Sequence, residues 1–127
     1  MKFDRLAGKY QERADFFYVY IAEAHPSDGW TMEKMPGGVA EMLGGKPVPK
    51  MPTTSEERCK TAKAWHDSVS TDVPLLVDPI SNRVNDAFSA RPERLYILLE
   101  DTVVYQGGPG PFEYNIDQMQ KYLESFI

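Results

Sequence analysis

The connection between two apolar segments near the end of the chain limits the possible folds more than any other feature. Segments 94–100 (RLYILLE) and 102–106 (TVVYQ) have strand composition, and the turn between them consists only of Glu100 and Asp101. Strands joined so tightly pair antiparallel, as a hairpin. Two earlier segments, 16–22 and 73–78, have the composition of short buried strands, and the first is a continuous apolar and aromatic run typical of a parallel strand. The sequence therefore predicts a mixed α/β sheet with a parallel part and a terminal hairpin.

Two helical segments are predicted before the third strand segment of this sheet. Residues 2–13 repeat apolar side chains at helical spacing. Thr54 and Glu57 have the spacing of a capping box, which opens a helix that runs to about Ser68. One face of this second helix carries Cys59, Ala62, His66 and Val69. We expect Cys59 to be buried on that face, as packed free cysteines usually are.

Two further helices complete the predicted flanks of the sheet. A brief helix follows Asn82. Asn115 and Gln118 form another capping pair, which opens a closing helix. The buried stripe of that helix is predicted to be Ile116, Met119, Leu123 and Phe126.

Length and composition predict one globular domain over residues 1–127. The segment 26–52 is so dense in glycine and proline that it reads as a long loop insertion. A net charge of −5 argues against nucleic acid as a partner. No apolar run approaches the roughly 18 residues of a membrane span, and the first residues do not resemble a signal peptide, so we expect a cytoplasmic protein. The single cysteine, Cys59, excludes an internal disulfide and any CxxC pair.

A polar cluster at the end of the first predicted strand is the main candidate for chemistry. The segment YVYIAEAHPSDGW ends the strand with Glu23, His25 and Trp30. His25 has the pKa range that suits proton delivery, although a histidine that only caps the loop is the alternative. Glu23 shares a strand face with His25 and can orient its imidazole, unless it is an ordinary solvated carboxylate. Trp30 is expected to anchor the loop with its ring.

A second candidate cluster lies at the start of the third strand. Pro92, Glu93 and Arg94 come together there, and an ordinary ion pair between Glu93 and Arg94 is the structural alternative to a functional site. Cys59 and His66 are seven residues apart with no further ligands at metal spacing, so no metal site is predicted.

Four blocks of the sequence, in order, resemble the iodothyronine deiodinase family. They are FYVYIAEAHPSDGW, EERCKTAKAW, LLVDPISNRVNDAFSARPERLYIL and VVYQGGPGPFEYN, and they span nearly the whole chain. The resemblance implies a thioredoxin-like fold, in which these residues lack the N-terminal central strand. That strand would lie between the strand that precedes the HPSDGW loop and the hairpin. The expectation is therefore a domain that begins upstream of Met1.

The resemblance also implies a reaction. Enzymes of the family are selenoproteins that remove iodine reductively from iodothyronines, with an external thiol as reductant and no bound cofactor. The selenocysteine, or a cysteine in its place, would lie just upstream of Met1, so residues 1–127 alone are expected to be inactive. His25 would lie beside that nucleophile and Glu93 would serve a proton path. Arg94 would lower the pKa of the nucleophile, and Pro92 is a candidate for a cis peptide bond.

Two departures from the family pattern bear on the substrate. Pro109 stands where some members carry a basic residue for the hormone carboxylate, and Met51-Pro52 stands near a histidine position of the family. The expected substrate is therefore a small halogenated aromatic compound, and a homodimer is the expected assembly by the same resemblance. A peroxiredoxin-like thiol peroxidase and a non-catalytic thioredoxin-like binding module are the alternative functions.

Overall fold

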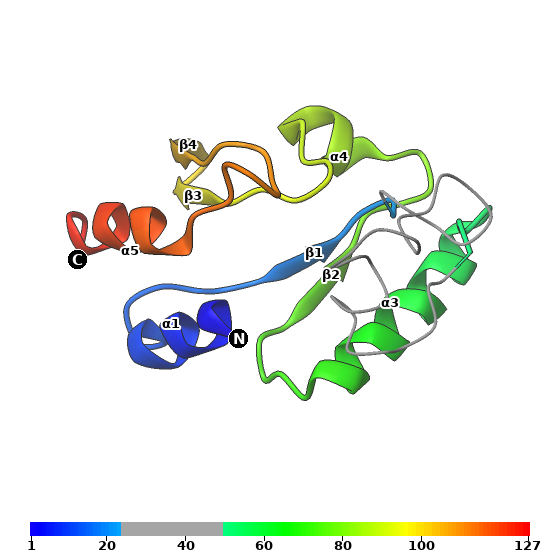
Figure 1. The fold of residues 1–127 in the computed structure, drawn as a ribbon, viewed down its shortest axis with the longest axis horizontal. Helices are drawn as coiled ribbons and strands as arrows, with labels where there is room; N and C mark the ends of the chain where they lie inside the picture. Colours follow the sequence, from blue (N-terminus) through cyan, green and yellow to red (C-terminus); the bar gives the residue numbers. More distant parts are fainter. Residues whose placement is uncertain (24–49) are drawn as a thin grey trace.

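A computed structural model describes residues 1–23 and 50–127 of the chain (Figure 1). The described part is a mixed α/β arrangement, as the sequence predicts. The elements follow in the order α1 (Lys2–Tyr10), β1 (Tyr18–Tyr20), α3 (Ser55–Val69), β2 (Leu75–Val77), α4 (Arg83–Phe88), β3 (Tyr96–Leu99), β4 (Thr102–Gln106) and α5 (Ile116–Glu124). No helix in these two ranges combines the length and the apolar character that a membrane span requires.

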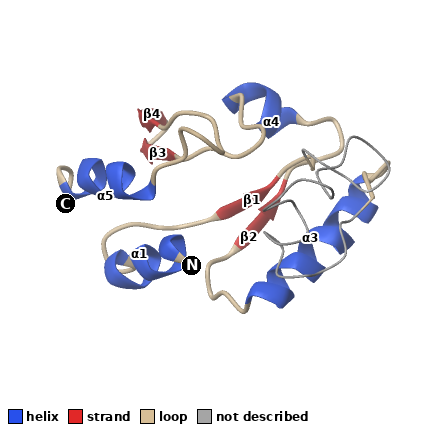
Figure 2. Ribbon diagram, viewed as in Figure 1, coloured by secondary structure: helices blue, strands red, loops and turns tan. Residues whose placement is uncertain are grey.

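The strands of the described ranges form two separate pairs (Figure 2). β1 and β2 are parallel, with Tyr18 opposite Leu75. β3 and β4 form the predicted antiparallel hairpin, with Leu99 opposite Thr102 across the turn. Glu100 in that turn adopts a positive φ of 56°. Parallel pairing of β1 with β2 and antiparallel pairing of the hairpin are therefore both confirmed.

Each strand of the two pairs has an outer edge with no partner among the described strands, and the outer edges of β1 and β3 bear on the predicted additional strand. The Tyr18 N–H bonds to the Pro74 carbonyl at 2.9 Å, so the peptide groups of Val19, one residue on, point away from β2. The Gly107 N–H bonds to the Leu95 carbonyl at 2.8 Å, so the peptide groups of Tyr96 point away from β4. In the view of Figure 1, β1 and β3 are the members of the two pairs that face each other. The described part thus has open edges on the two strands between which the sequence predicts an additional strand.

Aromatic contacts hold helices against β1. Trp65 of α3 packs against Tyr18 at 5.3 Å and against Tyr20 at 6.3 Å between ring centroids. Phe3 of α1 contacts Tyr18 and Phe16 at 4.9 and 5.6 Å. A second core joins α1, α5 and the hairpin, and its buried residues are Leu6, Leu95 and Met119. These contacts fix the position of the strand that carries the candidate site.

Both predicted helix caps are confirmed. The Thr54 hydroxyl accepts a hydrogen bond from the Glu57 N–H at 3.1 Å, and the Asn115 side chain accepts one from the Gln118 N–H at 3.0 Å. The carboxylate of Glu57 reaches back one residue further than a standard capping box, to the N–H of Thr53 at 2.8 Å. One free N–H of each first turn is therefore bound by the side chain of the N-cap residue.

Two predictions of burial are wrong. Cys59 is exposed, because α3 turns its neighbour Arg58 inward and Arg58 is only 1% exposed. One residue along a helix is about 100° around its axis, so Cys59 then points to solvent. Phe126 is 45% exposed because α5 ends at Glu124, although Met119 and Leu123 of the predicted stripe are buried.

Asp4 provides a test of how α1 is attached. Its carboxylate accepts hydrogen bonds from the hydroxyls of Tyr18, at 3.0 Å, and Thr71. Burial raises the pKa of Asp4, but these hydrogen bonds outweigh burial and the pKa lies below its ordinary value. A lowered folded-state pKa means that the stabilisation is present above about pH 4 and is lost as the pH falls through that pKa.

We therefore expect Asp4→Asn to flatten part of the acid dependence of stability. Between about pH 6 and pH 3, the free energy of unfolding from urea titrations should fall less in the variant than in the wild type, because the variant lacks the carboxylate that titrates. Asp86→Asn, at an exposed aspartate of α4, is the control. Equal acid dependence of all three proteins would contradict the role given to Asp4.

Candidate active site

The candidate site lies at the carboxyl edge of β1 and β2. Because the two strands are parallel, the residues that follow them emerge at the same edge, where α/β proteins commonly place ligands. Glu23 follows β1 and Asp78 directly follows β2. The Asp78 N–H bonds to the Tyr20 carbonyl at 2.9 Å, which keeps the two strand ends together.

Glu23 is held by a tyrosine of its own strand. The Tyr20 hydroxyl donates to Glu23 Oε1 at 2.5 Å, whereas Glu23 Oε2 is buried without a hydrogen-bond partner. Burial raises the pKa of Tyr20, and the hydrogen bond to Glu23 and the charge of Glu23 raise it further. Tyr20 therefore remains protonated at neutral pH and remains a donor to the carboxylate. This pair was not predicted, because residues three apart on a continuous strand lie on opposite faces. In the structure β1 ends at Tyr20, so the alternation stops there.

Two buried charged residues, Asp78 and Arg58, stabilise this edge through hydrogen bonds to the backbone. Asp78 is fully buried, and its two carboxylate oxygens accept the N–H groups of Val84 and Asn85, each at 2.9 Å. Arg58 of α3 donates from Nη1 to the carbonyls of Asp78, at 3.2 Å, and Pro79, at 2.8 Å. The Asp78 carboxylate thus binds free N–H groups in the first turn of α4. Arg58 attaches the end of β2 to α3. In the sequence, Arg58 is one of several charged residues in a polar helical segment, so its burial was not predicted.

The segment before β3 reaches the same edge. The Arg91 guanidinium donates from Nη2 to the carbonyl of Glu23 at 3.1 Å, across 68 residues of sequence. The peptide bond between Arg91 and Pro92 is cis, as predicted. Glu93 follows Pro92 directly in the chain.

The glycine loop 107–111 packs against Glu93. The Gly110 N–H bonds to the Glu93 carbonyl at 2.8 Å, and a Cβ on Gly110 would lie 2.4 Å from Glu93 Oε1. Only glycine therefore leaves Glu93 in its observed position. On the other side, Tyr114 is half-buried; burial raises its pKa, and the charge of Glu93 raises it further.

Arg94 binds backbone carbonyls rather than forming the ion pair named as the structural alternative. It donates from Nε to the Gly107 carbonyl at 2.6 Å and from Nη1 to the Ser89 carbonyl at 3.2 Å. Its guanidinium lies 5.9 Å from the centre of the Tyr96 ring. No ion pair between Glu93 and Arg94 occurs among the ion pairs of the described residues. Arg94 joins the start of β3 to the glycine loop, and its effect on a nucleophile stays a prediction.

The structure therefore brings part of the predicted site together. The Arg91 side chain links Glu23 to the segment that carries Pro92 and Glu93. His25 and Trp30 lie outside the described residues, and so does the partnership of Glu23 with His25. Within 1–23 and 50–127, no group of three or more His, Cys, Asp and Glu side chains is arranged to hold a metal ion.

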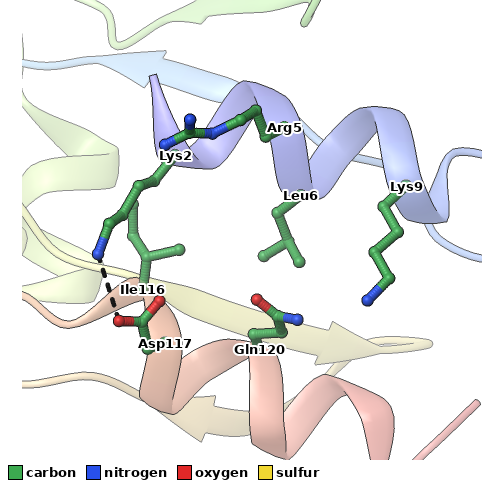
Figure 3. Close-up of a pocket in the computed structure, with 7 residues that line it drawn as sticks. All are labelled: Lys2, Arg5, Leu6, Lys9, Ile116, Asp117 and Gln120. Atoms are coloured by element: carbon green, nitrogen blue, oxygen red, sulfur yellow. Dashed lines mark hydrogen bonds and ion pairs between the residues drawn. The ribbon is translucent and has the colours of Figure 1, made fainter.

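The described part has a surface hollow next to this edge and another one away from it. The hollow next to the site has a volume of about 360 Å³ and is lined by Asn85, Asp86, Ser89 and Arg91. The other, about 230 Å³, lies between α1 and α5 (Figure 3). There Lys2 spans the hollow to Asp117 in an ion pair of 3.2 Å. The first hollow adjoins the candidate site because Arg91, which lines it, donates to the Glu23 carbonyl.

Comparisons with known proteins bear on what this edge does. The family model of iodothyronine deiodinase matches residues 1–127. Thyroxine 5-deiodinase of sheep (Ovis aries) is 34% identical over 124 residues, covering 98% of this chain and 39% of the sheep protein. The chicken (Gallus gallus) and gilthead sea bream (Sparus aurata) proteins of that name are 36% and 38% identical, and the matches cover 44% and 42% of their lengths. The chain spans about two fifths of the curated relatives that it matches. The chain belongs to the iodothyronine deiodinase family.

Proposed function

We propose that the protein containing these residues is a thiol-dependent oxidoreductase that removes iodine from an aromatic ring. The observation that carries the proposal is the hydrogen bond from Arg91 to the Glu23 carbonyl, which links the carboxyl edge of the parallel strand pair to the segment that carries Glu93. Reductive deiodination replaces an iodine by a hydrogen on a ring carbon, so it needs a positioned proton donor. Carboxylates held by hydrogen bonds beside a histidine are suited to that task.

The proposed reaction proceeds in three balanced steps. A selenol or thiol upstream of Met1 attacks the iodine; the carbon–iodine bond breaks and the ring carbon takes a proton, which His25 supplies with Glu23 and Glu93. An external thiol then attacks the resulting iodinated selenium or sulfur and releases iodide and a proton. A second thiol equivalent frees the enzyme as selenol or thiol and leaves as disulfide. Two thiols are oxidised for each iodine removed.

The nucleophile would stand at the end of a strand that pairs with both open edges. The unpaired peptide groups of Val19 and Tyr96 support this part of the proposal. So does the exposure of apolar side chains next to them, since Val19, Leu76 and Leu98 are 40, 52 and 51% exposed. A strand placed there would satisfy the backbone groups that are now unpaired, each worth about 1 kcal/mol.

The proposed substrate is an iodinated phenol. Thyroxine is the substrate that the names of the relatives state. In this chain Pro109 is exposed and carries no charge, so it offers no partner to a substrate carboxylate. We therefore expect a simple iodophenol to be turned over at least as well as an iodothyronine.

Iodide release tests the proposal. The full-length protein, with cysteine at the nucleophile position, is incubated with an iodophenol and a dithiol, and iodide and the deiodinated phenol are measured together. We expect equal amounts of both products. Residues 1–127 alone are the matched control and should release none. Peroxide reduction without iodide release would instead identify a thiol peroxidase, and neither activity would leave a binding module.

Gly110→Ala is expected to lower the activity with little effect on stability. The new Cβ would lie 2.4–2.7 Å from three atoms of the Glu93 side chain, which must move away. A flexible side chain moves at small cost, so the free energy of unfolding should change by less than about 1 kcal/mol. Since Glu93 would leave its position, kcat should fall at least about tenfold.

Gly8→Ala is the control for this substitution. A Cβ at Gly8 meets no atom within 4 Å, and the residue lies inside α1. Alanine there should raise the free energy of unfolding by about 0.5–1 kcal/mol without changing kcat. Unchanged kcat in Gly110→Ala would remove Glu93 from the proposed mechanism.

A further inference from the structure

The hollow between α1 and α5 gathers three cations of one helix (Figure 3). Lys2, Arg5 and Lys9 line it, and their spacing of three and four residues places them on one face of α1. All three side chains are exposed. The whole chain has a net charge of −5, so this local excess of positive charge is opposite in sign to the rest of the protein. Like charges on neighbouring helical turns repel each other, and a bound anion would offset that repulsion.

Only one of these cations has an ion-pair partner within residues 1–23 and 50–127. Lys2 pairs with Asp117 of α5 at 3.2 Å. Arg5 and Lys9 form no ion pair in that part of the chain. Asp117 is also the one acid among the described residues that line the hollow, so cations outnumber acids there three to one.

Two further acids of α1 and α5 are bound to tyrosine hydroxyls. Glu124, at the end of α5, accepts a hydrogen bond from Tyr10 at 2.7 Å. Asp4 accepts one from Tyr18 at 3.0 Å, which directs its carboxylate to β1 rather than to α5. Neither acid neutralises Arg5 through an ion pair. The Arg5 guanidinium therefore keeps its N–H donors for a ligand.

The floor of the hollow is apolar. Leu6 of α1 is only 4% exposed, and the half-buried Ile116 of α5 packs against the same core. Leu6 and Gln120 point toward each other across the space between the two helices (Figure 3). An apolar group placed there would be removed from water, while a charged group attached to it would remain among the cations.

The size of the hollow limits the ligand. Its volume is about 230 Å³, several times the roughly 30 Å³ that one water molecule occupies in the liquid. One ring or short alkyl chain with an acidic group fits such a space. A flat anionic surface, such as a membrane, would reach the exposed cations but not the apolar floor.

We propose that the hollow between α1 and α5 binds a small organic anion, a carboxylate or a phosphate joined to one apolar group. Arg5 binds the oxyanion through its planar fork of N–H donors, and Lys9 adds a second positive charge. Leu6 and Ile116 contact the apolar part. None of these residues takes part in the proposed deiodination, so the site does not depend on that function.

Titration of the full-length protein with matched ligands tests the site. Benzoate is the anion, and benzamide is a neutral compound of nearly the same shape. At low salt we expect benzoate to bind with a Kd below about 1 mM and benzamide to bind at least about tenfold more weakly. NMR chemical-shift changes of backbone amides should concentrate in α1 and α5. A comparison with phenyl phosphate shows which of the two acids binds more tightly.

Equal binding of benzoate and benzamide overturns the proposal, and so do shift changes confined to other elements. Binding to vesicles that contain an anionic lipid, without binding of benzoate or phenyl phosphate, would also overturn it. These measurements do not use iodide release, so failure of this site and failure of the proposed reaction are distinguished.

Variants with opposite expected effects complete the test. Arg5→Gln should weaken benzoate binding at least about tenfold, and Arg5→Lys should lose less, since lysine keeps the charge but not the fork. Arg13→Gln, at an exposed arginine beyond α1, is the matched control and should stay within about twofold. Asp117→Asn removes the acid and frees Lys2, so binding should tighten about two- to fivefold. Such a gain cannot result from misfolding. Unchanged binding in Arg5→Gln, or weaker binding in Asp117→Asn, would contradict the assignment.

Discussion

Replacing Glu23 by glutamine is expected to lower kcat for iodide release by about 10²–10⁴-fold, the usual contribution of a positioned acid or base. The amide has nearly the same shape and keeps an oxygen that accepts from Tyr20, but it cannot carry the transferred proton. The free energy of unfolding should therefore change by less than about 1.5 kcal/mol. Steady-state kinetics of the full-length protein and a urea titration measure the two effects.

Two controls separate proton transfer from a loss of structure. Glu12→Gln changes an exposed glutamate just after α1 and should alter neither quantity. Tyr20→Phe keeps the carboxylate but removes the hydrogen bond to it, so we expect a smaller loss in kcat, about tenfold. A Glu23→Gln enzyme within threefold of the wild type would show that the proton comes from elsewhere.

Asp78→Ala is expected to reduce the free energy of unfolding by about 3–5 kcal/mol, because two hydrogen bonds to a charged group are lost and each is worth about 1.5–3 kcal/mol. The N–H groups of Val84 and Asn85 in α4 would lose their acceptor at once. A typical domain has only about 5–15 kcal/mol in total. Denaturant titrations at neutral pH should therefore show a much lower midpoint with an unchanged slope.

Asp78→Asn and Asp86→Ala complete this comparison. The asparagine keeps one acceptor oxygen but presents an N–H₂ group to the second N–H, so its loss should be intermediate. Asp86 is an exposed aspartate of the same helix, and its replacement should change stability by less than about 0.5 kcal/mol. A loss below about 1 kcal/mol in Asp78→Ala would mean that α4 and the end of β2 hold together without this carboxylate.

Features governed by neighbouring residues were predictable from the sequence. The hairpin follows from a two-residue connection, and the predicted segment 102–106 coincides with β4. The caps of α3 and α5 follow from side chains that reach backbone groups two or three residues away. The order of the elements and the family resemblance could also be predicted from the sequence, because both depend on local patterns that occur in order along the chain.

Features that depend on tertiary contacts were not predictable. Arg58 is buried because carbonyls at the end of β2 accept its N–H groups, and no local pattern shows that. Cys59 is exposed as a consequence. The first strand was predicted over 16–22 and is only Tyr18–Tyr20, since β2 offers just three residues for pairing. The contact of Arg91 with Glu23 joins segments 68 residues apart.

The site was predicted only in part for the same reason. Glu23 and Glu93 were found because each stands next to a strand end, which the sequence marks with proline and polar residues. Tyr20 and Arg58 were missed because neither the end of β1 at Tyr20 nor the carbonyls that Arg58 binds at the end of β2 can be read from a local pattern. His25, Trp30 and the role of Arg94 toward a nucleophile stay predictions.

The central claim is that a strand from upstream of Met1 pairs with both open edges and carries the nucleophile to Glu23. Amide hydrogen exchange tests it most directly, with residues 1–127 compared with the full-length protein. The Val19 and Tyr96 amides point to the open edges, while the Tyr18 and Gly107 amides already have carbonyl partners and serve as references. The account predicts fast exchange of Val19 and Tyr96 in the 127-residue chain and protection at least about a hundredfold greater in the full-length protein. Equal protection of all four amides in both proteins would contradict it.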